Sequence, residues 1–167
     1  MNNEVLNDEF LKSIDSNYEF SNKPIRRLKK SQQSGEIKLQ LENLKKQIAE
    51  IDACDLKNHA NQLVFSDGNF RSKIMLVGEG PGQKEDEIGQ PFMGDAGKLL
   101  NKMLAAIDIK RESIYITNVV NYRPPNNRKP TTAEINKYSK FLYEHISIIN
   151  PKILIIMGGT AMEALIG

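Results

Sequence analysis

The chain has 167 residues, which suits one domain of about 100–150 residues and an extension. Its 23 basic and 21 acidic residues leave a net charge of +2, so binding of nucleic acid would need a local cluster of basic residues rather than a positive charge over the whole protein. A single cysteine, Cys54, excludes an internal disulfide framework. No apolar run reaches the roughly 18 residues of a membrane span, and the polar N-terminus has no signal-peptide core, so we expect a soluble cytoplasmic protein with no membrane partner.

The N-terminal part of the chain is polar and then becomes periodic. Residues 1–34 mix Asn, Ser, Asp and Lys without a sustained period, which predicts a flexible extension. The basic cluster at residues 24–30, PIRRLKK, could contact DNA phosphates, although such clusters are more often solvated tails. From Glu36 to Ile51 apolar residues recur at steps of four and three, which predicts an amphipathic helix that docks on the domain. We therefore expect an extension, residues 1–34, and one α/β domain, residues 35–167.

A buried strand followed by a glycine-rich loop is predicted at residues 74–82, IMLVGEGPG. Glycines allow the backbone to approach a ligand closely at the carboxyl end of a strand, where open α/β sheets bind ligands. Four acidic residues lie within nine positions, at Glu79 and at residues 85–87, and no Lys-Ser/Thr pair follows the glycines. A P-loop is therefore disfavoured, and the glycine spacing also fails the dinucleotide fingerprint. The loop favours a neutral ligand that forms hydrogen bonds.

An aromatic residue, Phe92, follows this loop between proline and glycine residues. For an isolated phenylalanine, packing in the core is the usual role. Asp95 is expected to cap a helix whose apolar positions run from Ala96 to Ile107 at helical spacing.

The second half of the chain alternates strands and helices. A strand is predicted at residues 114–120, IYITNVV, with Asn118 near its end, where an isolated asparagine usually forms a turn. Residues 131–134, TTAE, form a capping box before a helix on which His145 is expected to be structural. A third strand at residues 153–157 ends at two glycines, and Thr160 is expected to cap a short helix, residues 161–166. This order predicts a three-layer, doubly wound α/β fold with a parallel sheet.

The loop at residues 121–130, NYRPPNNRKP, is basic and restricted by prolines. Arg123, Arg128 and Lys129 are the candidate DNA-binding residues within it. A plain connecting loop remains an equal alternative on these residues alone.

Three blocks resemble the family 4 uracil-DNA glycosylases, the bacterial and archaeal type with an iron-sulfur cluster. They are residues 78–100 (GEGPGQKEDEIGQPFMGDAGKLL), residues 117–125 (TNVVNYRPP) and residues 151–167. The match covers about residues 48–167 in the order and spacing of the family. The resemblance implies a DNA repair enzyme that flips uracil out of DNA, hydrolyses the N-glycosidic bond and leaves an abasic site. Uracil-containing DNA is then the expected partner, and the chain is expected to act as a monomer.

The resemblance also implies roles for individual residues. The uracil-binding set comprises Gly78, Glu79, Gly80, Phe92 and Asn118. Phe92 would stack on the base and Asn118 would read its edge, while backbone groups of the loop would hold O2. Glu79 and Glu85 are the candidate catalytic carboxylates. Two roles are open for them: orienting the attacking water, or holding Asn118 in place.

The family's iron-sulfur cluster has four cysteine ligands. Cys54 matches one of these positions, whereas Ile51, Tyr122 and Tyr138 stand at or near the others. One thiolate cannot hold a cubane cluster. We therefore expect no cluster and no metal, with Cys54 as a small buried residue and the two tyrosines packed into the vacated space.

The resembled family continues into a further strand and a His-Pro-Ser/Ala loop, whose histidine donates to the base O2. This sequence ends at Gly167, and neither His59 nor His145 lies in such a motif. We therefore expect a C-terminally truncated chain that lacks the final strand. Two alternatives stay open: a uracil- or DNA-binding module with impaired catalysis, and an unrelated Rossmann-like nucleotide binder, which the acidic loop disfavours.

Overall fold

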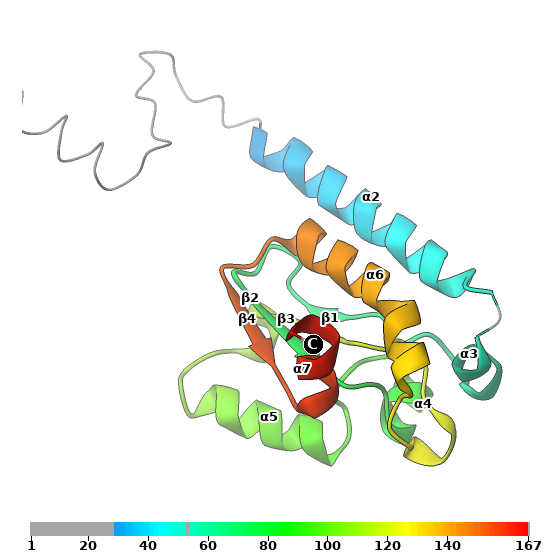
Figure 1. Ribbon diagram of the computed structural model, residues 1–167. Coiled ribbons are helices and arrows are strands. Elements are labelled where there is room, and N and C mark those ends of the chain that lie inside the picture. Colours follow the sequence, from blue (N-terminus) through cyan, green and yellow to red (C-terminus); the bar gives the residue numbers. More distant parts are fainter. Residues whose placement is uncertain (1–28, 53, 167) are drawn as a thin grey trace, which may run out of the picture. The chain divides into compact units, whose positions relative to one another are not determined.

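The computed structural model describes residues 29–52 and 54–166 (Figure 1). Ser31–Gly167 form one compact unit. Residues 1–28, with most of the predicted extension and of the basic cluster, lie outside the described residues. Helix α2, Lys29–Ala49, begins inside the predicted extension. Lysine and glutamine have good helix propensity, so the helix continues beyond the apolar repeat that marked it in the sequence.

The sheet has four strands in the order β1-β3-β2-β4. They are β1 (Asp67–Gly68), β2 (Ile74–Gly78), β3 (Tyr115–Asn118) and β4 (Ile153–Ile156). The strands β3 and β4 both pair with β2 in parallel, which confirms the predicted α/β arrangement, whereas β1 pairs with β3 antiparallel. The sheet is therefore mixed and not wholly parallel. The short edge strand was missed because two residues, Asp-Gly, carry no hydrophobic pattern.

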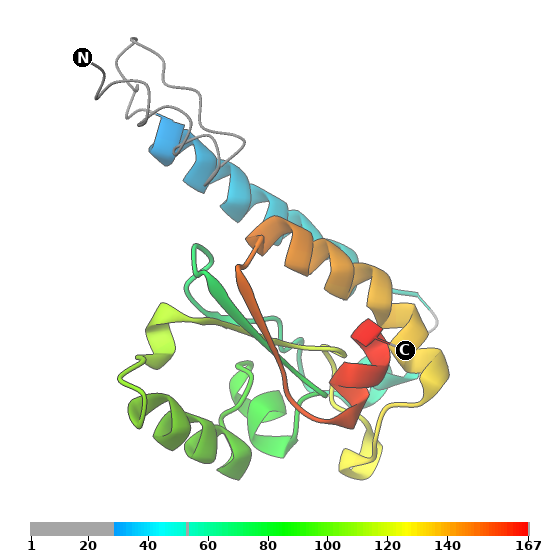
Figure 2. The same ribbon diagram turned by 60° about the vertical axis from the view of Figure 1, so that its left-hand side comes forward.

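Helices cover both faces of the sheet (Figures 1 and 2). Besides α2 they are α3 (Asp55–His59), α4 (Gln83–Ile88), α5 (Asp95–Ala105), α6 (Thr132–Ile149) and α7 (Gly159–Ile166), with short 3-10 turns η1 (Arg111–Ser113) and η2 (Pro125–Asn127). From β2 the chain runs through α5 to β3 on one side, and then through α6 to β4 on the other side of β2. Right-handed crossovers in opposite directions place these two helices on opposite faces. The result is a three-layer fold with its switch point at β2.

The apolar core lies in two clusters, one on each face of the sheet. Met75 and Val77 pack in the larger cluster with α2, α6 and α7, and the intervening Leu76 packs in the smaller cluster with α5. This alternation follows from the two-residue period of a strand. Leu44 and Ile48 of α2 are both 0% exposed, which confirms that this helix docks on the domain.

The acidic stretch is a helix, and the predicted cap at Asp95 was wrong. The acidic stretch after the glycines is the helix α4, in which Glu85 and Asp86 are buried rather than solvated. Asp95 is the first residue of α5 and pairs with Lys98, while Gly94 takes the N-cap position. The Glu85 carboxylate accepts hydrogen bonds from the backbone before α5, whereas the Asp86 carboxylate accepts them from Asn61 and Gln62. Among the described residues, no helix is both long enough and apolar enough to cross a membrane.

Candidate functional site

The carboxyl ends of β2 and β3 bring the predicted site residues together. Gly78 and Asn118 are register partners at the last position of each strand. The ladder continues one step into the loops, where the Val119 N–H donates to the Gly78 carbonyl at 2.9 Å and the Val120 N–H donates to the Glu79 carbonyl at 3.2 Å. The glycine-rich loop and the loop after β3 therefore leave the sheet side by side.

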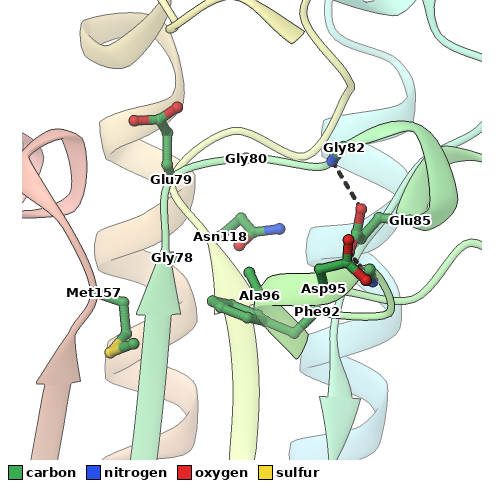
Figure 3. A pocket seen from close by; sticks show the side chains of 11 residues that line it. Gly78, Glu79, Gly80, Gly82, Glu85, Phe92, Asp95, Ala96, Asn118 and Met157 are labelled. Carbon is green, nitrogen blue, oxygen red and sulfur yellow. Dashed lines mark hydrogen bonds between the residues drawn. The ribbon is translucent and has the colours of Figure 1, made fainter. Parts of the chain in front are cut away.

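A hollow of about 410 Å³ opens at this edge of the sheet (Figure 3). Its lining residues are Gly78, Glu79, Gly80, Gly82, Glu85, Phe92, Gly94, Asp95, Ala96, Asn118 and Met157. All the residues predicted to bind uracil are among them, together with both candidate carboxylates. The hollow is large enough for a ring-sized ligand.

Asn118 presents an unpaired polar group to this hollow. Its side chain is 4% exposed, and its Nδ2 has no hydrogen-bond partner within the described part of the chain. Leaving a buried donor unpaired costs about 1–3 kcal/mol. Such a group is unusual in a folded protein, and an acceptor on a ligand would satisfy it. Asn118 thus ends the parallel ladder of β3 with an unpaired amide nitrogen at the hollow, rather than forming the turn expected of an isolated asparagine.

Phe92 lies against Asn118 because Gly78 has no side chain. A Cβ built on Gly78 would lie 2.6 Å from Asn118 Oδ1 and 2.6 Å from Phe92 Cζ. The phenylalanine has a positive φ of 56°, a conformation that costs a residue with a Cβ about 1–2 kcal/mol. It lines the hollow and is only partly buried, unlike a phenylalanine of the core.

Glu85 uses its carboxylate to hold backbone. One oxygen accepts hydrogen bonds from the N–H groups of Met93 and Gly94, both at 2.7 Å, and the other accepts from the Gly82 N–H at 3.0 Å. Burial alone would raise the pKa of Glu85, but the backbone donors outweigh it and hold the pKa below its ordinary value. The group is therefore a carboxylate at neutral pH, and it ties the start of α4 to the segment before α5.

Glu79 is held from a different element. The hydroxyl of Thr160, on α7, donates a hydrogen bond to a carboxylate oxygen of Glu79. Thr160 was predicted to cap its helix; it lies instead inside α7, 5% exposed, and binds the site. In Figure 3 Asn118 lies between the two carboxylates, Glu79 and Glu85. The contribution of Thr160 was not predictable, because 81 residues separate it from Glu79 and no local pattern joins them.

Comparison with known proteins identifies the family of the chain. Residues 65–167 match the sequence profile of the Uracil DNA glycosylase superfamily. The chain belongs to this superfamily. It is 42% identical over 123 residues to the Type-4 uracil-DNA glycosylase of Thermotoga maritima, covering 74% of this chain and 64% of that protein. The protein of the same name from Archaeoglobus fulgidus is 42% identical over 123 residues, covering 74% and 62%.

A third relative is the Type-4 uracil-DNA glycosylase of Sulfurisphaera tokodaii, 43% identical over 119 residues, which cover 71% of this chain and 54% of that protein. The chain therefore spans less than two thirds of the length of each of these relatives.

The three candidate DNA-binding residues, Arg123, Arg128 and Lys129, lie in the loop between β3 and α6, outside the lining of the main hollow. Arg128 pairs through two nitrogens with both carboxylate oxygens of Glu134, at 2.8 and 2.7 Å, which lowers the pKa of that carboxyl to about 2. Glu134 also completes the predicted capping box with Thr131. Arg123 donates to Asn127 at 2.7 Å and lines a separate hollow, whereas Lys129 is exposed.

The four residues that the resemblance places at or near cluster ligands do not fit an iron-sulfur cluster. Ile51, Cys54, Tyr122 and Tyr138 all belong to the larger apolar cluster, with exposures of 8%, 5%, 5% and 0%. Cys54 Sγ lies 3.2 Å from Tyr138 Oη, and burial raises the pKa of Tyr138, so its phenol stays neutral. This donor set offers one thiol where a cluster needs four ligands. The predicted packing of the tyrosines and the burial of Cys54 are confirmed.

Proposed function

We propose that this chain is a uracil-DNA glycosylase domain, which flips uracil out of DNA and hydrolyses its N-glycosidic bond to leave an abasic site for repair. The observation that carries the proposal is the unpaired, buried amide nitrogen of Asn118 beside the Phe92 ring, in a chain of this superfamily. Its substrate is uracil-containing DNA. We further propose that it acts as a monomer in the cytoplasm, with residues 35–167 as the catalytic domain and residues 1–34 as an extension.

Selection of the base rests on Asn118. A carboxamide offers a donor to the base O4 and an acceptor to N3–H at the same time. Cytosine presents the opposite pattern at these two positions, so it would leave both groups unpaired at a cost of about 1–3 kcal/mol each. Phe92 stacks on the extruded base and offsets part of the few kcal/mol needed to take it out of the stack.

Cleavage of the bond develops negative charge on the base and positive charge on the sugar. The backbone at Gly78, Glu79 and Gly80 holds O2 where the negative charge forms. The Glu79 carboxylate stabilises the oxocarbenium-like sugar and orients the attacking water, as carboxylates do in glycoside hydrolysis. We assign Glu85 to positioning of the loop, because its oxygens already accept three backbone N–H groups.

Contact with the DNA backbone is assigned to Arg123, Arg128 and Lys129. Phosphate contacts position a duplex or a single strand without reading its sequence. Lys129 is free to approach a phosphate as an exposed ammonium, whereas Arg128 must share its guanidinium with Glu134. Of the two, we therefore expect Lys129→Ala to weaken DNA binding more.

We also propose that the domain carries no iron-sulfur cluster, because its donor set holds one thiol. Protein purified anaerobically from cells supplied with iron should contain no stoichiometric iron or sulfide and should lack the visible absorption of a cluster. Bound iron that is lost in Cys54→Ser would contradict this proposal.

The proposed activity is tested with the purified chain and an oligonucleotide that contains a single uracil, followed by alkaline cleavage at abasic sites. Strand cleavage should appear with the wild type and with Asn58→Ala, an exposed control on α3, and should disappear with Asn118→Ala and Phe92→Ala. Absence of cleavage combined with uracil-DNA binding that depends on Asn118 would instead identify a binding module. Absence of both would refute the assignment of the pocket.

A further inference from the structure

We infer that Arg111, at the start of η1, is a positioning residue that sets the Phe92 ring for base stacking. Its catalytic consequence rests on the proposed function. Arg111 Nη2 donates to the Pro91 carbonyl at 2.6 Å, and Nη1 donates to the Phe92 carbonyl at 3.2 Å. The guanidinium thus binds two consecutive carbonyls on the segment that carries the ring.

Two further contacts fix the guanidinium itself. Nε donates to Asp67 Oδ2 on β1 at 2.8 Å, and Nη1 donates to Asn101 Oδ1 on α5 at 3.1 Å. The side chains of Arg111 and Asp67 are 18% and 25% exposed, so the ion pair is largely shielded from water. Arg111 therefore joins the edge of the sheet, helix α5 and residues 91–92. The planar fork of an arginine can make these contacts at once, whereas the single ammonium of a lysine cannot.

Opposite charges hold the two ends of this segment. The cation of Arg111 binds its carbonyls at residues 91 and 92, and the anion of Glu85 binds its N–H groups at Met93 and Gly94. Helix α5 packs closely against the same segment, since a Cβ on Gly97 would lie 1.7 Å from the Phe92 carbonyl oxygen.

The positive φ of Phe92 is the state that this arrangement maintains. A phenylalanine does not prefer φ of 56°, and such a conformation persists only where its surroundings over-determine it. Without the guanidinium, both carbonyls lose their donors and the segment is free to relax toward negative φ. The ring would then leave its place beside Asn118 and its packing against the smaller apolar cluster.

The test compares Arg111→Met and Arg111→Lys with Arg71→Met, which removes the same charge from an exposed arginine outside the site. The first readout is amide hydrogen exchange at Met93 and Gly94, which reports local opening of the segment and does not need activity. We expect exchange on the order of tenfold faster in both Arg111 variants and unchanged in Arg71→Met. The lysine variant keeps a cation beside Asp67, so it remains informative if the methionine variant fails to fold.

The second readout is uracil release in a single turnover with enzyme in excess. We expect a fall of about 10²-fold in both Arg111 variants, the usual effect of misplacing a reacting partner by about 1 Å, and a change within about twofold in Arg71→Met. Unchanged exchange at Met93 and Gly94 would overturn the inference, whether or not activity falls. Faster exchange with unchanged release would overturn it too. If the wild type releases no uracil, the proposed function fails, while the exchange data still decide whether Arg111 orders the segment.

Discussion

Replacing Gly78 by alanine tests the pocket at its most crowded point. The new Cβ would lie 2.6 Å from Asn118 Oδ1 and from Phe92 Cζ, against 3.4 Å for an ordinary contact, so each group must move by about 0.8 Å. Misplacing a reacting partner by about 1 Å costs up to about 10²-fold in rate. Overpacking of this kind also costs about 1–3 kcal/mol of stability. We expect a large loss of uracil release and a moderate loss of stability.

The assay measures single-turnover release of uracil and urea unfolding for Gly78→Ala and for Gly35→Ala. Gly35 lies in α2, and its Cβ would meet nothing within 4 Å, so the control should keep its activity. Alanine in a helix interior should stabilise it by about 0.5–1 kcal/mol. Activity of Gly78→Ala within about threefold of the wild type would refute the claim that Asn118 and Phe92 jointly contact the base.

Three other changes have expected outcomes. Thr160→Val removes the donor to Glu79, and a hydrogen bond to a charged group contributes about 1.5–3 kcal/mol, so single-turnover release should fall at least about tenfold without loss of binding. His145 donates to or accepts from Tyr115 in the core, and burial lowers its pKa to about 3 from 6.5. As the pH falls from 6.5 toward 3, the unfolded chain binds a proton that the folded chain excludes, so the wild type should lose about 1.4 kcal/mol of stability per pH unit. In His145→Gln this loss should be absent when the free energy of unfolding is measured in urea. Leu44→Ala on α2 should lower the free energy of unfolding by about 2–5 kcal/mol in the same assay.

Matched controls separate these effects from general damage. Thr132→Val, at an exposed hydroxyl on α6, should leave uracil release unchanged. Leu39 is 58% exposed on the same helix as Leu44, so Leu39→Ala should change stability by less than about 0.5 kcal/mol. An equal loss in the two leucine variants would mean that α2 does not dock through its apolar face. If the free energy of unfolding falls with pH as steeply in His145→Gln as in the wild type, the histidine takes up its proton within the folded protein.

The sequence by itself predicted the α/β architecture and six of the residues that line the pocket. Short apolar runs at residues 74–77, 114–120 and 153–157, separated by helical periods, leave few alternatives to an α/β sheet. The strands β2 and β3 are largely buried, as such runs predict, whereas β4 at the edge of the sheet is partly exposed. The glycine-rich loop, Phe92 and Asn118 carry their chemistry in their residue types and their places at strand ends. The resemblance likewise predicted, from the sequence, that Ile51, Tyr122 and Tyr138 stand at or near positions where the family has cluster cysteines.

Only the tertiary structure decided which parts of the protein each of these groups contacts. In sequence Glu79 and Glu85 are two equivalent carboxylates of one acidic stretch, yet one binds a hydroxyl on α7 and the other binds backbone before α5. No sequence motif marked Arg111 as part of the site, because it binds main-chain carbonyls, which every residue possesses. Hydrogen bonds across 19 to 81 residues depend on how helices pack on the sheet, and local patterns contain no record of that packing.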